Sequence, residues 1–219
     1  SVTSFTIQDD LVACRAARDA LGDAVTTVAK GAHISVMARE TLEKNPALDI
    51  AIMGEYELAA KEIALATDLR KVYGLSFRDR ATGSIVTTEA RRFLETLDIL
   101  PFPARHLLDN KMYLRPDTGQ MQTTVQTCRG CGANCIFCLS GTVYGKKVRV
   151  RSPRNVVDEL EQCVRVHKIK DFFFRADTFT WNRPWVMEVC QGILDRKLDI
   201  RWVCNSRVDT IDAERLAIM

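Results

Sequence analysis

The 219-residue sequence predicts an α/β protein that contains two incomplete α/β domains. Short apolar stretches typical of buried strands alternate with helix-like stretches in residues 1–65, and the same alternation recurs in residues 121–219. The chain does not begin with methionine, and its last residues, IDAERLAIM, read as the first two turns of a helix. We therefore expect both ends to be cut from a longer protein. Strands that alternate with helices pair in parallel, and ligands then bind beyond their carboxyl ends.

The first domain is predicted to hold two parallel strands joined by a helix. Residues 24–29 and 50–53 are short and apolar, as buried strands are, and residues 35–43 between them have helical character. Gly31 and Gly54 follow the two strands, where a sheet of this kind binds ligands. Glycines at these places also fit plain turns, and the spacing alone leaves both interpretations open.

Residues 66–120 predict a packed connector between the two domains. Residues 73–78 and 83–86 read as a hairpin. Residues 100–105 contain two prolines, neither of which can donate a sheet hydrogen bond. A low-complexity linker would be poorer in Leu, Phe and Tyr, so we expect this segment to pack.

The second domain repeats a strand and a helix three times. Ser152 before Pro153 predicts the start of its first helix, because a hydroxyl caps the free amides of a first turn and proline needs no partner there. This succession suggests the first half of a β/α barrel, whose chemistry lies at the carboxyl ends of its strands. The expected strands are residues 123–127, 170–174 and 200–204, and the expected helices begin near Ser152, Trp185 and either Thr210 or Asp212.

Three cysteines spaced C-x3-C-x2-C, at Cys131, Cys135 and Cys138, are the most informative feature of the sequence. Three thiolates this close can bind three corners of a 4Fe-4S cluster and leave the fourth iron open to a substrate. Counting Cys128 extends the pattern to C-x2-C-x3-C-x2-C, which leaves open an electron-transfer cluster with four ligands. A structural zinc site is the other alternative, although its two cysteine pairs are normally separated by ~15–20 residues.

Composition favours a soluble, cytoplasmic enzyme. Hydrophobic residues make up 47% and charged residues 27%, and a net charge of +3 is too small to indicate a nucleic-acid partner. No apolar run approaches the ~18–20 residues that cross a bilayer, so we expect no transmembrane segment. The cysteines outside the cluster motif are isolated among apolar residues, as in a reducing compartment: Cys14, Cys163, Cys190 and Cys204.

The cysteine motif with Phe137, and the segments KKVRVRSPRNVVDELEQCV, DFFFRADTFTWNRPWV and IRWVCNSRVDTID, resemble the radical S-adenosylmethionine enzymes. They resemble in particular the branch with an N-terminal cobalamin-binding domain, over nearly the whole chain. The resemblance implies a partial Rossmann-like cobalamin-binding domain followed by the first half of a radical S-adenosylmethionine barrel. Two positions depart from the family pattern. Gly132 replaces a usual proline, and only Asp177 remains of two aspartates that members often show.

The resemblance also implies a role for several side chains. Cys131, Cys135 and Cys138 would bind the cluster, and Phe137 would lie against the adenine of S-adenosylmethionine. The remaining contacts to this cofactor would come from strand ends, with Asp177 accepting from its ammonium and Arg207, beside Asn205, pairing with its carboxylate. By position alone, these three could equally be solvated loop residues, and Phe137 could plug the mouth of the barrel.

For cobalamin, the resemblance points to Gly31, Gly54 and Glu55, which match the small residues and the G-E-x-E sequence of cobalamin-binding domains. His33 does not stand in the motif of a lower-ligand histidine, so we expect a surface or capping role for it.

The implied activity is that of a cobalamin-dependent radical enzyme that cleaves S-adenosylmethionine reductively and abstracts hydrogen from a small-molecule substrate. Cobalamin could then deliver a methyl group, although some relatives rearrange or cyclise their substrates. A reductant such as flavodoxin or ferredoxin is the expected partner. The nearest rival is a methylthiotransferase, but that family has additional cluster cysteines in its N-terminal domain, where this chain has only Cys14.

Overall fold

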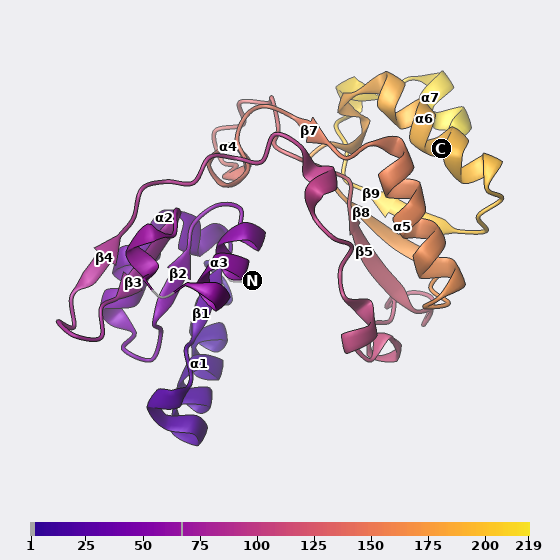
Figure 1. Ribbon diagram of the computed structural model, residues 1–219. Helices are drawn as coiled ribbons and strands as arrows, with labels where there is room; N and C mark the ends of the chain where they lie inside the picture. The colour runs from indigo at the N-terminus through magenta and orange to yellow at the C-terminus, as the bar shows by residue number, and fades with distance from the viewer. Residues whose placement is uncertain (1–2, 67) are drawn as a thin grey trace. The chain divides into compact units, whose positions relative to one another are not determined.

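The computed structural model describes residues 3–66 and 68–219, which form two compact units (Figure 1). The first unit comprises Ser1–Leu94 with Ala133–Lys146, and the second comprises Glu95–Gly132 with Lys147–Met219. The division runs through the cysteine motif. Cys131 therefore belongs to the second unit, whereas Cys135 and Cys138 belong to the first. No helix of the described residues is long and apolar enough to cross a membrane.

The first unit contains a four-stranded sheet in the order β1-β2-β3-β4. Strands β1 (Val28–Lys30) and β2 (Ile50–Ile52) are parallel, as predicted, with Val28 opposite Ile50. Strands β3 (Leu75–Arg78) and β4 (Ile85–Thr87) form the predicted hairpin and extend the sheet in antiparallel fashion. The sheet is therefore mixed.

Helices cover both faces of this sheet. Helices α1 (Ile7–Leu21) and α2 (Ala32–Lys44) pack against the face that carries Ala29 and Ala51, and α3 (Glu57–Leu65) packs against the face that carries Ile50 and Ile52. Because neither face of β2 meets solvent, all of its residues are buried. This explains why its sequence is apolar throughout and does not alternate.

Two boundaries differ from those predicted. The first strand begins at Val28 and not at residue 24, because Gly22–Ala24 form a 3-10 turn after α1. The segment 66–120 is divided between the two units, because the β3–β4 hairpin buries Leu75 and Phe77 against the first sheet. Only from Glu95 onward does the chain belong to the second unit.

The second unit contains a parallel sheet in the order β5-β8-β9, formed by Gln122–Gln126, Asp171–Arg175 and Arg201–Cys204. Strand order follows chain order, which confirms an α/β fold with a helix after each strand. The described strands form an open sheet. The other elements of the chain are α4 (Ser140–Val143) in the first unit and β6 (Cys128–Arg129), β7 (Arg149–Val150), α5 (Pro153–Arg165), α6 (Arg183–Asp195) and α7 (Ala213–Ile218) in the second.

The start of α5 follows the predicted capping signal, and α6 starts in a similar way. The Ser152 hydroxyl accepts a hydrogen bond from the Asn155 amide at 3.2 Å, with Pro153 in the first turn of α5. Asn182 caps α6 in the same way, through the Trp185 amide at 3.2 Å. Helices α5 and α6 then bury one apolar face against the sheet (Figure 1), and the residues of this core include Val156, Leu160, Phe172, Phe174, Val186 and Val189.

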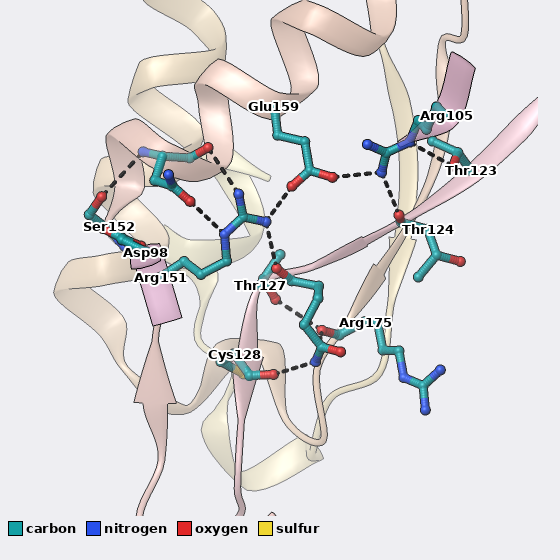
Figure 2. Close-up of polar contacts among 12 residues, drawn as sticks. Asp98, Arg105, Thr123, Thr124, Thr127, Cys128, Arg151, Ser152, Glu159 and Arg175 are labelled. Carbon is teal, nitrogen blue, oxygen red and sulfur yellow. Dashed lines mark hydrogen bonds and ion pairs between the residues drawn. The ribbon is translucent and has the colours of Figure 1, made fainter. Parts of the chain in front are cut away.

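A buried ion network holds the carboxyl end of β5 in place. Figure 2 shows Glu159 of α5 between the guanidinium groups of Arg105 and Arg151. Arg105 also donates to the Thr124 carbonyl at 2.9 Å, and the Arg151 amide donates to the Thr127 carbonyl at 3.0 Å. The strand is thus fixed up to the residue that precedes Cys128.

Candidate functional site

The carboxyl edge of the second sheet carries the first cysteine of the motif. Beyond the last residue of β5, the Thr127 amide donates to the Arg175 carbonyl at 3.0 Å, so β5 and β8 stay joined as the chain turns away. The Cys131 thiol is partly exposed and lies 3.8 Å from the Thr178 hydroxyl, which follows β8. Sequence reasoning missed Thr178, although its position directly after a parallel strand was a signal.

The backbone at Gly132 lies directly against the indole of Trp181. A Cβ atom at position 132 would lie 2.6 Å from Cζ2 and 3.0 Å from Cη2 of that ring. A side chain at position 132 would therefore require the indole to move. Trp181, which sequence reasoning also missed, is 40% exposed.

The other two cysteines lie in the first unit, on a turn before α4. Cys135 is half-buried and Cys138 is exposed, and the Cys138 amide donates to the Cys135 carbonyl at 3.2 Å. Phe137 between them is 87% exposed. Across residues 3–66 and 68–219, no three or more His, Cys, Asp or Glu side chains are grouped so that they could hold a metal ion.

Cys128 differs from the three motif cysteines, because its side chain is only 2% exposed. Burial raises the pKa of this thiol to about 12, and the nearby carboxylate of Asp177 acts in the same direction. Cys128 therefore stays a thiol at neutral pH and forms part of the apolar core. This environment is typical of a structural cysteine.

The predicted strand-end residues have different surroundings. Asp177 is half-buried, and its carboxylate lies near Cys128, where it raises the pKa of that thiol. Asn205 is exposed, and its carbonyl accepts from the Phe179 amide at 2.9 Å. Arg207 donates to Asp209 through Nε at 3.0 Å and Nη2 at 2.6 Å, and this pairing lowers the pKa of that carboxyl group. The Arg207 guanidinium is thus already paired with a carboxylate.

In the first unit, the structure brings Gly31 and Gly54 together at the carboxyl ends of β1 and β2. The Ser35 hydroxyl donates to the Gly31 carbonyl at 2.9 Å and accepts from the Gly54 amide at 3.1 Å. Both glycines have positive φ, 134° and 73°, a conformation that favours glycine. Sequence reasoning missed Ser35, because only the fold places it between the two loops.

Glu55 points into the first unit. It is 4% exposed, and its Oε2 accepts from the Leu94 amide at 2.8 Å. The helix α4, which follows the cysteine motif, packs against α2, and a Cβ atom at Gly54 would lie 3.8 Å from the Val143 carbonyl. His33, in the first turn of α2, has its Nδ1 3.0 Å from the Ser4 hydroxyl.

No family model matches the chain, but several known protein sequences do. It is 30% identical over 216 residues to an uncharacterized methyltransferase of Pyrococcus horikoshii, covering 97% of this chain and 46% of that protein. It is 29% identical over 194 residues to the anaerobic magnesium-protoporphyrin IX monomethyl ester cyclase of Cereibacter sphaeroides, covering 84% and 31%. It is 30% identical over 186 residues to the cobalamin-dependent radical SAM methyltransferase TokK of Streptomyces tokunonensis, covering 80% and 25%.

Solved structures share the fold. The radical S-adenosylmethionine methyltransferase TsrM of Kitasatospora setae, with cobalamin and a [4Fe-4S] cluster bound, matches with a TM-score of 0.73 at 18% identity over 97% of this chain and 43% of that chain. The cobalamin-dependent S-adenosylmethionine radical enzyme OxsB matches with a TM-score of 0.69 at 19% identity, over 95% and 30%. The chain spans less than half the length of these proteins. The chain is therefore a homologue of cobalamin-dependent radical S-adenosylmethionine enzymes and shares their fold.

Proposed function

We propose that this chain is part of a cobalamin-dependent radical S-adenosylmethionine enzyme that transfers a methyl group to an unactivated carbon of a small molecule. One observation carries the proposal. Three cysteines at C-x3-C-x2-C spacing are exposed or half-buried beyond the first parallel strand, whereas the fourth cysteine beside them is buried as a thiol. Three accessible thiols and one sequestered thiol suit a cluster with one open iron.

The donor set fits an iron–sulfur cluster, because thiolates are the ligands that such clusters take. Cys131, Cys135 and Cys138 would hold it. When bound, the cluster supplies an electron and an open iron at which S-adenosylmethionine is activated. The chain contributes the position of each thiol and the groups around it.

Neighbouring side chains would bind S-adenosylmethionine. We propose that Asp177 accepts from its ammonium group and that Arg207, beside Asn205, pairs with its carboxylate. Arg207 would exchange its present partner Asp209 for the cofactor. Phe137 is 87% exposed, which supports a contact of its ring with the adenine.

Cobalamin would lie at the carboxyl edge of the first sheet. TokK and OxsB are described as cobalamin-dependent enzymes, and the TsrM structure contains cobalamin. Gly31 and Gly54 leave the backbone of this edge without side chains, which suits close approach by a large ring. Because the Glu55 carboxylate is bonded to the Leu94 amide, we propose that Glu55 shapes the loop and does not contact the ligand.

Methyl transfer is the favoured reaction, because methyltransferases are prominent among the relatives. Cyclisation is a second candidate, on the strength of the 29% identity to the ester cyclase. No relative named above is a methylthiotransferase. One TsrM structure contains tryptophan, which supports a small-molecule substrate. A reductant such as flavodoxin or ferredoxin would supply the electron, in the cytoplasm.

Iron and sulfide content after anaerobic reconstitution tests the proposal. Each of the variants Cys131→Ala, Cys135→Ala and Cys138→Ala is expected to lose most of its iron. The matched control Cys128→Ala is expected to keep it, because that thiol is buried in the apolar core. Loss of iron from Cys128→Ala would instead indicate four ligands and electron transfer, and bound zinc without iron would indicate a structural zinc module.

A further inference from the structure

Trp181 is a large aromatic residue whose position is not explained by the core. It ends a 3-10 turn, Phe179–Trp181, that follows β8, and it remains 40% exposed. Its indole lies in contact with the backbone of Gly132, the residue after Cys131. Trp181 is not part of the apolar core of the second unit, so its contact with the cysteine motif is its distinguishing feature.

The turn that carries Trp181 is rigid. Thr178, Phe179 and Thr180 are at most 3% exposed. The Phe179 ring lies 5.3 Å from the rings of both Trp185 and Trp202. Arg215 donates to the Thr180 carbonyl at 2.8 Å, which holds the turn from the other side. Trp181 thus projects from a fixed base.

The same turn contacts the cysteine motif on both sides of one peptide bond. Thr178 lies 3.8 Å from the Cys131 thiol, and Trp181 meets the backbone of Gly132. We propose that Trp181 is a positioning residue, whose indole fixes the Gly132 backbone and thereby the direction of the Cys131 thiol. The functional meaning rests on the proposed function, in which Cys131 binds the cluster.

Gly132 leaves room for the Trp181 indole because it has no Cβ atom. A Cβ at position 132 would lie within 3.0 Å of two indole atoms, so one of the two residues would have to move. The φ angle of Gly132 is not positive, unlike that of Gly130 and Gly145, so its backbone conformation is open to other residues. Alanine at 132 is therefore opposed by Trp181 and not by its own backbone.

The first test uses the protein without a cluster. The rate at which iodoacetamide modifies Cys131 is read from the fragment ions of its tryptic peptide, which distinguish Cys131 from Cys135 and Cys138. Gly132→Ala is expected to change this rate at least about fivefold, the smallest effect of overpacking a fitted contact. The matched control is Gly141→Ala, where the nearest atom to the new Cβ is Lys146 Cγ at 3.5 Å, and it should react as the wild type does.

Rescue separates positioning from general damage. Phenylalanine at 181 lacks the two indole atoms that meet position 132, so Gly132→Ala/Trp181→Phe should react as Trp181→Phe alone does. In the reconstituted protein, Gly132→Ala should also lose iron to a chelator faster than Gly141→Ala.

Equal Cys131 reactivity in Gly132→Ala and Gly141→Ala would overturn the proposal, since the indole would then simply swing into solvent. Failure of the wild type to take up iron would instead overturn the proposed function, while the reactivity of Cys131 would still decide the role of Trp181.

Discussion

The carboxyl edges of the two sheets are built from different parts of the chain. In the first unit, the edge consists of backbone groups, the Gly31 carbonyl and the Gly54 amide, joined by the Ser35 hydroxyl. In the second unit, the edge carries reactive side chains, with Cys131 beside Thr178. A backbone edge keeps its shape through its own hydrogen bonds. An edge that carries reactive side chains depends on the rigidity of the residues packed beneath those side chains.

Accordingly, more interactions hold the second edge in place. It combines an aromatic cluster around Phe174 and Phe179 with the buried pairing of Glu159 to Arg105 and Arg151. In the first unit, small and aliphatic residues with Phe77 fill both faces of the sheet. The comparison indicates that the interior of the second unit, which carries Cys131 and Thr178, is more polar. Substitutions there should lower its stability more strongly.

Removing the charge of Glu159 tests this difference most strongly. Glu159→Gln leaves two guanidinium groups, with side chains 3% and 9% exposed, without a counter-charge. The free energy of unfolding of the second unit should fall by ~3–5 kcal/mol, as when one partner of a buried pair is removed. Urea unfolding followed by tryptophan fluorescence measures it, because Trp181, Trp185 and Trp202 all lie in this unit.

The matched control for that variant lies on the same helix. Glu161→Gln removes a carboxylate that pairs with Arg165 and Arg196, each at 2.6 Å, while remaining 25% exposed. It should cost less than ~1 kcal/mol, as solvated pairs do. Equal losses in the two variants would contradict the idea that buried charge supports the second edge.

Alkaline pH should also weaken the second unit. Burial raises the pKa of Cys163, Cys190 and Cys204 to about 11, from an ordinary value of 9.0. As pH rises past 9.0, the unfolded thiols lose their protons while the folded thiols keep theirs, so the unfolded state is favoured. The stability conferred by the buried neutral thiols is complete below pH 9.0 and is lost as pH approaches 11.

Urea unfolding followed by tryptophan fluorescence, compared between about pH 8 and about pH 10.5, measures this decline. Cys190→Ala should flatten the dependence, because it removes one of the buried thiols. A second unit as stable at the higher pH as at the lower would show that its thiols are more accessible than the structure indicates.

A smaller effect is expected at the backbone edge. Ser35→Ala removes the hydroxyl that joins Gly31 to Gly54, and the loss should be ~1–2 kcal/mol because two hydrogen bonds disappear together. Hydrogen exchange at the Gly54 amide should accelerate accordingly. Ser84→Ala, whose hydroxyl bonds to Thr82 on the surface, should leave that amide unchanged. Unchanged exchange in Ser35→Ala would show that Ser35 does not hold the edge together.

Local signals in the sequence predicted a large part of the fold. The cap of α5, the β3–β4 hairpin and the location of each strand all depend on residues close together in the chain. The sequence did not reveal that the hairpin pairs with β2, because that choice depends on a distant apolar face. Nor did it show that Arg105 would meet Glu159 across the second unit.

The site divides in the same way. The spacing of Cys131, Cys135 and Cys138 is local, so the sequence identified them without the fold. The contact of Trp181 with Gly132 joins residues far apart in the chain, so no local sequence pattern predicts it. Glu55 matched a family motif, yet only the structure shows its carboxylate bonded to the Leu94 amide.

The central claim is that three cysteines hold a cluster with one open iron. Electron paramagnetic resonance of the anaerobically loaded and reduced protein, with and without S-adenosylmethionine, tests it most directly. We expect a cluster signal that changes when S-adenosylmethionine is added, because the cofactor binds the open iron. A cluster signal that S-adenosylmethionine leaves unaltered would contradict the account, as would bound zinc in place of iron.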